Sequence, residues 1–96
     1  MITDREKNNI QQFYKAVLSL KTPEECDAFF DDVATIKELL DMSARLEVAG
    51  MLDDGMVFNE ISSKTGASST TISRVNKCLG YGSGGYRIVL DRIKNK

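Results

Sequence analysis

The sequence predicts an all-α fold of about six helices, and three observations support this prediction. Apolar residues recur at helical spacing in several segments, whereas no segment shows the sustained alternation of a half-buried strand. The single proline, Pro23, stands at the start of a predicted helix, and glycines stand where helices are expected to end. With 96 residues, the chain is long enough for one compact domain with a modest core.

Three helices are predicted in the first half of the chain. The first covers roughly residues 3–20, and its apolar face comprises Ile10, Phe13, Tyr14, Val17 and Leu18. The second is short and begins with Thr22 as cap, Pro23 and a capping box closed by Glu25; its inner face comprises Cys26, Phe29, Phe30 and Val33. The third begins with Thr35 and Glu38 in the same pattern and ends near Asp54, before Gly55. Its expected inner positions are Ile36, Leu39, Leu40, Leu46, Ala49 and Leu52.

The second half predicts three shorter helices. One covers about residues 57–64 and ends at Gly66, and the next begins at a cap on Ser68 or Ser69 and ends near Leu79. The glycine-rich residues 80–86 are predicted to be a turn. A last helix, about residues 87–94, carries Ile88, Val89 and Ile93.

Charge is distributed unevenly, although the net charge is only −1. Residues 22–60 contain eleven acids and two bases, whereas residues 61–96 contain seven bases and one acid. This polarity suits a molecule with one end that faces DNA and one that avoids it. The alternative is that both blocks are merely solvated faces.

Other classes of protein are disfavoured by what the chain lacks. Without histidine, it cannot form a His–Cys zinc site, a Ser–His triad or a Cys–His pair, so an enzyme is the least favoured class. The acids of residues 24–32 are better explained as helix-start and solvent-facing charges. Cys26 and Cys78 are predicted to be buried free thiols. No apolar run reaches the ~20 residues of a membrane span, and the first residues do not resemble a secretory signal. We therefore expect a cytoplasmic protein with no membrane contact.

Residues 57–79 have the pattern of a helix-turn-helix. Two short helices that cross steeply need an apolar inner residue in the first, a small residue at the crossing, and a glycine in the turn. Ile61, Ser62 and Gly66 meet these needs. Ile72 and Val75 provide the inward-facing apolar residues of the second helix.

The remaining faces of that second helix are polar. A recognition helix enters the major groove with its first residues near base edges, where hydroxyls bond bases or phosphates and a threonine methyl can contact thymine. We therefore predict a DNA-binding surface that also includes two lysines as phosphate contacts: Asn59, Lys64, Ser68, Ser69, Thr70, Thr71, Ser73 and Lys77. The alternative is a helical hairpin whose serines and threonines only cap a helix.

Most of the chain resembles the tryptophan repressor family. The resemblance rests on residues 45–49, 52–56, 60–61 and 66–74, while the tail of residues 79–86 resembles a separate branch of that family. It implies an intertwined homodimer of the Trp-repressor type, built from one domain over residues 1–96. In that domain, helices within residues 3–54 dimerise, residues 57–79 form the helix-turn-helix, and residues 87–94 form the last helix. The two recognition helices would enter successive major grooves of a near-palindromic operator in double-stranded DNA.

The resemblance also implies an effector site. In the family, two arginines and a threonine hold L-tryptophan, and the matching residues are Arg45, Arg74 and Thr35. Three departures argue against tryptophan itself: Val75 replaces a glycine that makes room for the indole, Asp32 replaces an apolar lining residue, and Cys78 replaces a serine. A smaller amino-acid-like effector, or none, fits better. Alternatively, Arg45 and Arg74 pair with nearby carboxylates such as those of Glu47, Asp41 or Asp32.

The function predicted from these features is that of a transcriptional regulator that binds DNA as a homodimer, with repression favoured over activation. Phe58, Asn59 and Ser62 stand where the repressor has longer polar or basic side chains, so the operator sequence does not carry over. The second hypothesis is a protein-interaction module that keeps the scaffold and docks a protein on its polar face.

Overall fold

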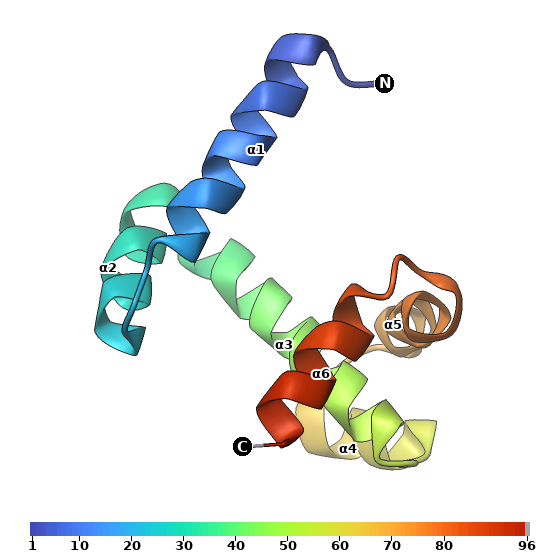
Figure 1. The fold of residues 1–96 in the computed structure, drawn as a ribbon. Helices are drawn as coiled ribbons and strands as arrows, with labels where there is room; N and C mark the ends of the chain where they lie inside the picture. The colour runs from blue at the N-terminus through green and yellow to red at the C-terminus, as the bar shows by residue number, and fades with distance from the viewer. Residues whose placement is uncertain (96) are drawn as a thin grey trace. The chain divides into compact units, whose positions relative to one another are not determined.

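Every regular element that the computed structural model contains within residues 1–95, the range it describes, is an α-helix (Figure 1). The helices are α1 (Asp4–Leu18), α2 (Pro23–Val33), α3 (Ile36–Asp53), α4 (Phe58–Thr65), α5 (Ser69–Tyr81) and α6 (Gly85–Lys94). The prediction of an all-α chain with six helices is therefore confirmed. The residues pack as two compact units, Met1–Ile36 and the chain from Lys37 onward.

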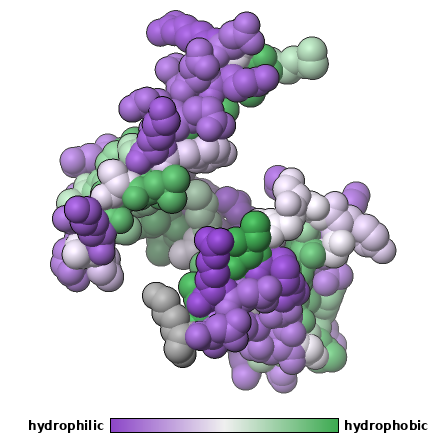
Figure 2. All heavy atoms as spheres, in the orientation of Figure 1, coloured by the Kyte–Doolittle hydropathy of each residue, from purple (hydrophilic) through white to green (hydrophobic). Residues whose placement is uncertain are grey.

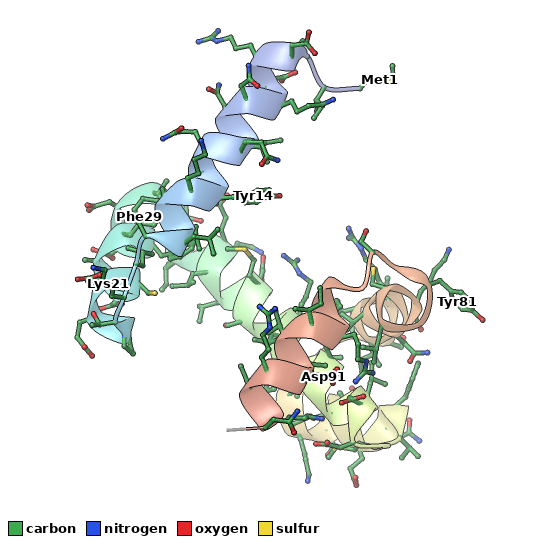
Figure 3. All side chains as sticks on the ribbon, in the orientation of Figure 1. Met1, Tyr14, Lys21, Phe29, Tyr81 and Asp91 are labelled. Carbon is green, nitrogen blue, oxygen red and sulfur yellow. The ribbon has the colours of Figure 1, made fainter. Side chains whose placement is uncertain are left out.

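The N-terminal unit pairs α1 with α2 through aromatic rings. The Phe13 ring centroid lies 5.9 Å from that of Phe29 and 6.5 Å from that of Phe30, and the last two rings meet edge to face at 5.5 Å (Figure 3). Edge-to-face pairs at these distances are favourable. Nevertheless, neither helix contains a buried residue. The apolar faces of this unit therefore remain largely exposed in the single chain.

Side-chain caps define where α1 and α2 begin. Thr3 and Glu6 form a full capping box on α1, which also lowers the pKa of the Glu6 carboxyl because that carboxylate accepts the Thr3 backbone N–H at 2.8 Å. Thr22 caps α2 as predicted. The predicted box at Glu25 is incorrect in one detail, because its carboxylate accepts the N–H of Lys21 (2.9 Å), one residue before the cap.

The C-terminal unit is built around a small apolar core. Its fully buried members come from four helices: Val48 and Ala49 of α3, Ile61 of α4, Ile72 and Val75 of α5, and Leu90 of α6. Partly buried side chains, including Met51, Leu52, Met56, Leu79 and Tyr86, pack around them. The core thus joins α4 and α5 to the second half of α3.

The inner face predicted for α3 is correct only near its C-terminal end. Ala49 is buried and Leu52 is half-buried, but Ile36 and Leu40 are 70% and 59% exposed. Val48, which was not predicted to lie inside, is fully buried. In the first half of α3, only Leu39 of the predicted inner residues is half-buried.

The glycine-rich segment is a shorter turn than predicted. α5 continues through Gly80 to Tyr81, and the Gly82 N–H still donates to the Cys78 carbonyl at 2.8 Å. A Cβ at Gly82 would clash with that carbonyl, which explains the glycine there. The turn closes at Gly84, whose φ of 85° is in the left-handed region. Consequently α6 begins at Gly85, two residues earlier than expected.

α6 turns a different face inward from the one predicted. Ile88, Val89 and Ile93 remain 42–52% exposed, whereas Leu90 is 2% exposed. A Cβ on Gly50 of α3 would lie 3.8 Å from the Leu90 side chain, so the two helices approach closely there. In Figure 2, hydrophobic surface lies among hydrophilic residues over this unit.

Ion pairs fasten α6 to the end of α3. The Asp53 carboxylate accepts hydrogen bonds from Arg87 and Lys94, both at 2.7 Å, and Lys94 also bonds Asp54 at 2.7 Å. Arg87 further contacts Asp91, labelled in Figure 3, at 3.3 Å. The hydrogen bond from Arg87, followed by that from Lys94, lowers the pKa of Asp53 to about 2. The same bonds raise the pKa values of Arg87 and Lys94.

Within residues 1–95, no helix has both the length and the apolar content that a transmembrane span requires.

Candidate nucleic-acid interface

The junction between α4 and α5 is a tight turn centred on Gly66. Gly66 has a φ of 75°, and its N–H donates to the Ser62 carbonyl at 2.8 Å, which ends α4. Two residues later, the Ser68 hydroxyl accepts the Thr71 N–H at 3.1 Å and begins α5. The predicted glycine stop at Gly66 is confirmed, and of the two predicted caps, Ser68 and Ser69, the structure shows Ser68.

Two hydroxyl groups on α4 also hold this turn. The Thr65 hydroxyl donates to the Ile61 carbonyl (2.8 Å) and accepts the N–H of Ala67 (3.1 Å). The Ser62 hydroxyl donates to the Ala67 carbonyl (3.0 Å). Both polar groups of the Ala67 backbone are therefore bonded to α4 side chains. We call Ser62, Thr65 and Ala67 the hydroxyl brace.

Three buried side chains fix the inner faces of both helices. Ile61 is 0% exposed, and Ile72 and Val75 are each 1% exposed. They belong to one core cluster, as their spacing predicted. The orientation of α5 about its own axis is thereby set; Leu79 also packs against the core, Thr71 is half-buried, and the other residues of the helix are exposed.

The predicted DNA-binding residues are brought together on α4, the turn and α5. Thr71 is half-buried, and the other seven are exposed: Asn59, Lys64, Ser68, Ser69, Thr70, Ser73 and Lys77. Thr71 is partly occupied by the cap, since its hydroxyl lies 3.1 Å from that of Ser68. Thr70 is therefore the more available threonine of the pair.

Basic side chains near this surface are fewer than the sequence count suggested. Arg87 and Lys94 belong to the C-terminal block of bases, yet Asp53 and its neighbours engage both. Lys64, Arg74 and Lys77 are exposed on α4 and α5, and none has an ion-pair partner within residues 1–95. These three are the cations that the interface can offer from its two helices.

A polar pocket of about 430 Å³ lies between α3 and the turn. It is lined by Asp41, Ala44, Arg45, Thr65, Gly66, Ala67, Ser68 and Thr71. Arg45 is half-buried, and within residues 1–95 its guanidinium has no hydrogen-bond or ion-pair partner. Asp41 instead pairs with Lys37 at 2.9 Å. The predicted alternative, in which Arg45 pairs with a local carboxylate, is therefore wrong for this chain.

The other residues matched to the family's effector site are placed differently. Arg74 is exposed and does not line the pocket of Arg45. Val75 lies in the core and does not line that pocket either. Thr35 directly precedes α3 and belongs to the N-terminal unit.

Both cysteines are exposed, so the prediction of buried thiols is wrong. Cys26 lies on α2, whose apolar face is uncovered in a single chain. Cys78 lines an apolar pocket of about 570 Å³, together with Leu46, Gly82, Ser83, Gly85, Tyr86 and Val89.

Sequence reasoning missed two features of the site. The bonding role of Thr65 was not predicted, and Ser62 was noted only for its small size, although hydroxyl residues near a helix end are a known signal for bonds to the backbone. The cluster around Asp53 was also missed, because its partners are 34 and 41 residues away in sequence. No local pattern reports pairing over such separations.

Comparison with known proteins assigns this architecture to a family. The family model described as Trp repressor protein matches residues 8–94. The uncharacterized protein YerC of Bacillus subtilis (strain 168) is 49% identical over 85 residues, which is 88% of this chain and 82% of YerC. A crystal structure of a TrpR-like protein from Eubacterium eligens ATCC 27750 superposes with a TM-score of 0.87 at 47% identity, covering 91% of this chain and 90% of that one. A crystal structure of a candidate Trp repressor from Staphylococcus aureus gives 0.88 at 37% identity, covering 99% and 98%.

Proposed function

Because the chain belongs to the Trp repressor family, a family of non-enzymatic regulators, we propose that it is a sequence-specific DNA-binding transcriptional regulator. It acts as a repressor, binding a near-palindromic operator as a homodimer. The observation that carries this proposal is the exposed, hydroxyl-rich start of α5, which Gly66 and the buried Ile72 and Val75 hold outward from the core.

α5 is the recognition helix in this proposal. Its first turn presents the Ser69 and Thr70 side chains and the free backbone N–H groups of a helix start, which suit base edges and a phosphate. Lys64 and Lys77 lie exposed on the flanking parts of α4 and α5 and contact phosphates. Asn59, Ser73 and Thr71 complete the contact surface.

A homodimer accounts for the apolar surface that a single chain leaves uncovered. α1 and α2 have no buried residue, although both carry apolar faces. Leu18, Val33, Ile36 and Leu40 are 51–83% exposed. Exposed apolar helix faces of this kind are expected to be buried by association. Interlocking of these helices between two subunits also places two copies of α5 on one DNA duplex.

The decisive experiment is selection of DNA from a random-sequence pool by the purified protein. We expect a near-palindromic consensus with half-sites about one helical turn apart. Recovery of no consensus would contradict the proposal and favour the alternative function, a protein-interaction module that uses the same polar face.

A charge substitution at Thr70 then tests the face itself. Thr70→Glu places a carboxylate against the phosphates and is expected to abolish specific binding. Gln11→Glu on α1 adds the same charge to an exposed residue outside the helix-turn-helix and serves as the control. Equal affinities of the two variants in fluorescence anisotropy would exclude α5 as the reading helix.

The unpartnered Arg45 supports modulation by a small anionic effector. A half-buried guanidinium that lines a pocket is suited to grip a carboxylate. One wall of the pocket is the turn between α4 and α5, so a bound molecule would change the angle between these two helices. Thr35 and Arg74, which the family resemblance also implies, do not line this pocket, so the proposal rests on Arg45. Val75 lies in the core and does not line this pocket, so it does not limit the size of an occupant. Polar and small side chains line the pocket, and a small amino acid is therefore the better candidate than L-tryptophan.

Calorimetric titration of the wild type and of Arg45→Gln with glycine, L-serine and L-tryptophan tests this site. Binding of a small amino acid that Arg45→Gln weakens at least tenfold supports it. The absence of heat with all three ligands, while DNA binding persists, would leave a regulator without an amino-acid effector.

A further inference from the structure

We propose that Ser62 and Thr65 are positioning residues that set the angle at which α5 meets DNA, without contacting DNA themselves. This inference rests on the proposed function and concerns the same site. It assigns the two hydroxyl groups a role separate from the base and phosphate contacts of α5.

The geometry of the hydroxyl brace supports this role. Ala67 is the middle residue of the three between α4 and α5. Its N–H has the Thr65 hydroxyl as acceptor at 3.1 Å, and its carbonyl accepts from Ser62 at 3.0 Å. Thr65 is in turn anchored on the Ile61 carbonyl at 2.8 Å, and Ile61 is fully buried. A chain of hydrogen bonds therefore connects the core of α4 to the residue that precedes the Ser68 cap of α5.

The turn needs this support because its glycine permits more than one path. Gly66 has a φ of 75°, and a Cβ there would meet no atom within 4 Å, so packing does not confine the backbone at that point. Within α5, Ile72, Val75 and Leu79 contact the core, and each of them follows the first three residues of the helix. Ser69 and Thr70 precede these contacts, so the hydrogen bonds of the turn add to the packing of Ile72 in setting their position.

Ser62 is half-buried and its hydroxyl is directed to the Ala67 carbonyl, which distinguishes it from an exposed residue that reads bases. The Ser62 side chain is short, and its hydroxyl is engaged within the turn, so it controls the turn and does not extend to a base. Small errors in orientation weaken specific contacts strongly, because base-edge hydrogen bonds require exact geometry.

The test compares Ser62→Ala, Thr65→Val and the double variant with the wild type. Thr65→Val keeps the shape of the side chain and removes the hydroxyl, and Thr65→Ser restores the hydroxyl as the rescue variant. Ser63→Ala is the matched control, because Ser63 neighbours Ser62 on α4, is exposed, and its hydroxyl has no hydrogen-bond partner within residues 1–95. Thermal unfolding by circular dichroism ensures that each variant is assayed while folded.

Two readouts separate positioning from a purely structural effect. The first is the ratio of affinity for the selected operator to affinity for unrelated DNA of equal length. We expect each single variant to lower operator affinity about threefold to tenfold, as for loss of one partly buried hydrogen bond, with affinity for unrelated DNA unchanged within about twofold because charge dominates it. The second is amide hydrogen exchange at Ala67, which should accelerate in Thr65→Val and return in Thr65→Ser.

Each result has a definite meaning. Accelerated exchange with a lower affinity ratio, rescued by Thr65→Ser, supports the proposal. Accelerated exchange with an unchanged ratio overturns it, as does a loss that Ser63→Ala shares. If the wild type selects no operator, the proposed function fails, and positioning for DNA fails with it. If the wild type selects an operator and the variants bind it with the affinity of the wild type, the proposed function stands and only the positioning role is wrong.

Discussion

At Gly66 the backbone adopts a conformation that only glycine takes without strain. Its φ of 75° is left-handed, and the Gly66 N–H closes the last bond of α4. Gly80, in contrast, lies inside α5 with an ordinary φ and open space around it. The two glycines therefore predict opposite responses to the same substitution.

Gly66→Ala is expected to lower the free energy of unfolding by about 1–2 kcal/mol, because alanine resists the left-handed region. Gly80→Ala is expected to raise it by about 0.5–1 kcal/mol, because alanine favours a helix interior. Urea unfolding followed by circular dichroism measures both values. A destabilised Gly80→Ala would show that the end of α5 requires flexibility.

Asp53 is the subject of a second prediction about a single residue. Its carboxyl has a pKa of about 2, below the usual value of 3.8, so its ion pairs stabilise the fold above about pH 4. That contribution is lost as the pH falls from about 4 towards 2, when the carboxylate becomes protonated. Carbon NMR of the Asp53 carboxyl should report the low pKa, and Arg87→Gln should raise it. Lys37→Gln, which removes only the pair with Asp41, should leave it unchanged.

Among the helices, α6 shows where a periodic pattern is ambiguous. Its apolar residues form two possible faces, one with Ile88, Val89 and Ile93 and one with Tyr86 and Leu90. The second face lies inside because Leu90 meets Gly50, while Arg87 and Lys94 reach Asp53. Both of these determinants lie on α3.

Leu90→Ala should therefore destabilise the C-terminal unit by about 2–5 kcal/mol, the range for a buried leucine. Chemical unfolding of the purified protein measures the change. Val57→Ala is the comparison, since Val57 is 67% exposed at the start of α4 and should matter little. Similar losses for the two variants would mean that Leu90 is not the anchor of α6.

Local signals predicted the boundaries that depend on caps. Thr22, Gly55, Gly66 and Ser68 begin or end helices as their residue types require. The extent of α5 was not predicted, because the low helix propensity of Gly80 is overcome by packing of Leu79 on the core. The unpartnered Arg45 and the hydroxyl brace likewise depend on tertiary neighbours.

For the molecule as a whole, the proposed homodimer depends on apolar helix residues that the single chain leaves exposed. Leu18 and Leu40 are 83% and 59% exposed. In the proposed homodimer these side chains become buried. Ile36 and Leu40, in the first half of α3, then take the inner role predicted from the sequence.

Leu40→Lys is expected to convert the homodimer to monomer at micromolar concentration, because it places a charge in an apolar interface. Sedimentation velocity measures the change in mass. Tyr81→Lys is the control, since Tyr81 is 90% exposed and points away from α5 in Figure 3. A monomeric wild type would refute the dimer before either variant is made.

The clamp between Asp53 and the two cations of α6 also responds to ionic strength. These side chains are 18–48% exposed, so added potassium chloride screens their attraction and loosens the carboxy-terminal helix. In the proposed complex with DNA, the same salt also weakens the contacts with phosphates. A plot of the logarithm of the affinity for DNA against the logarithm of the salt concentration is then expected to be steeper than phosphate contacts by Lys64, Arg74 and Lys77 alone would make it. The slope would therefore overestimate the number of phosphates that the protein contacts.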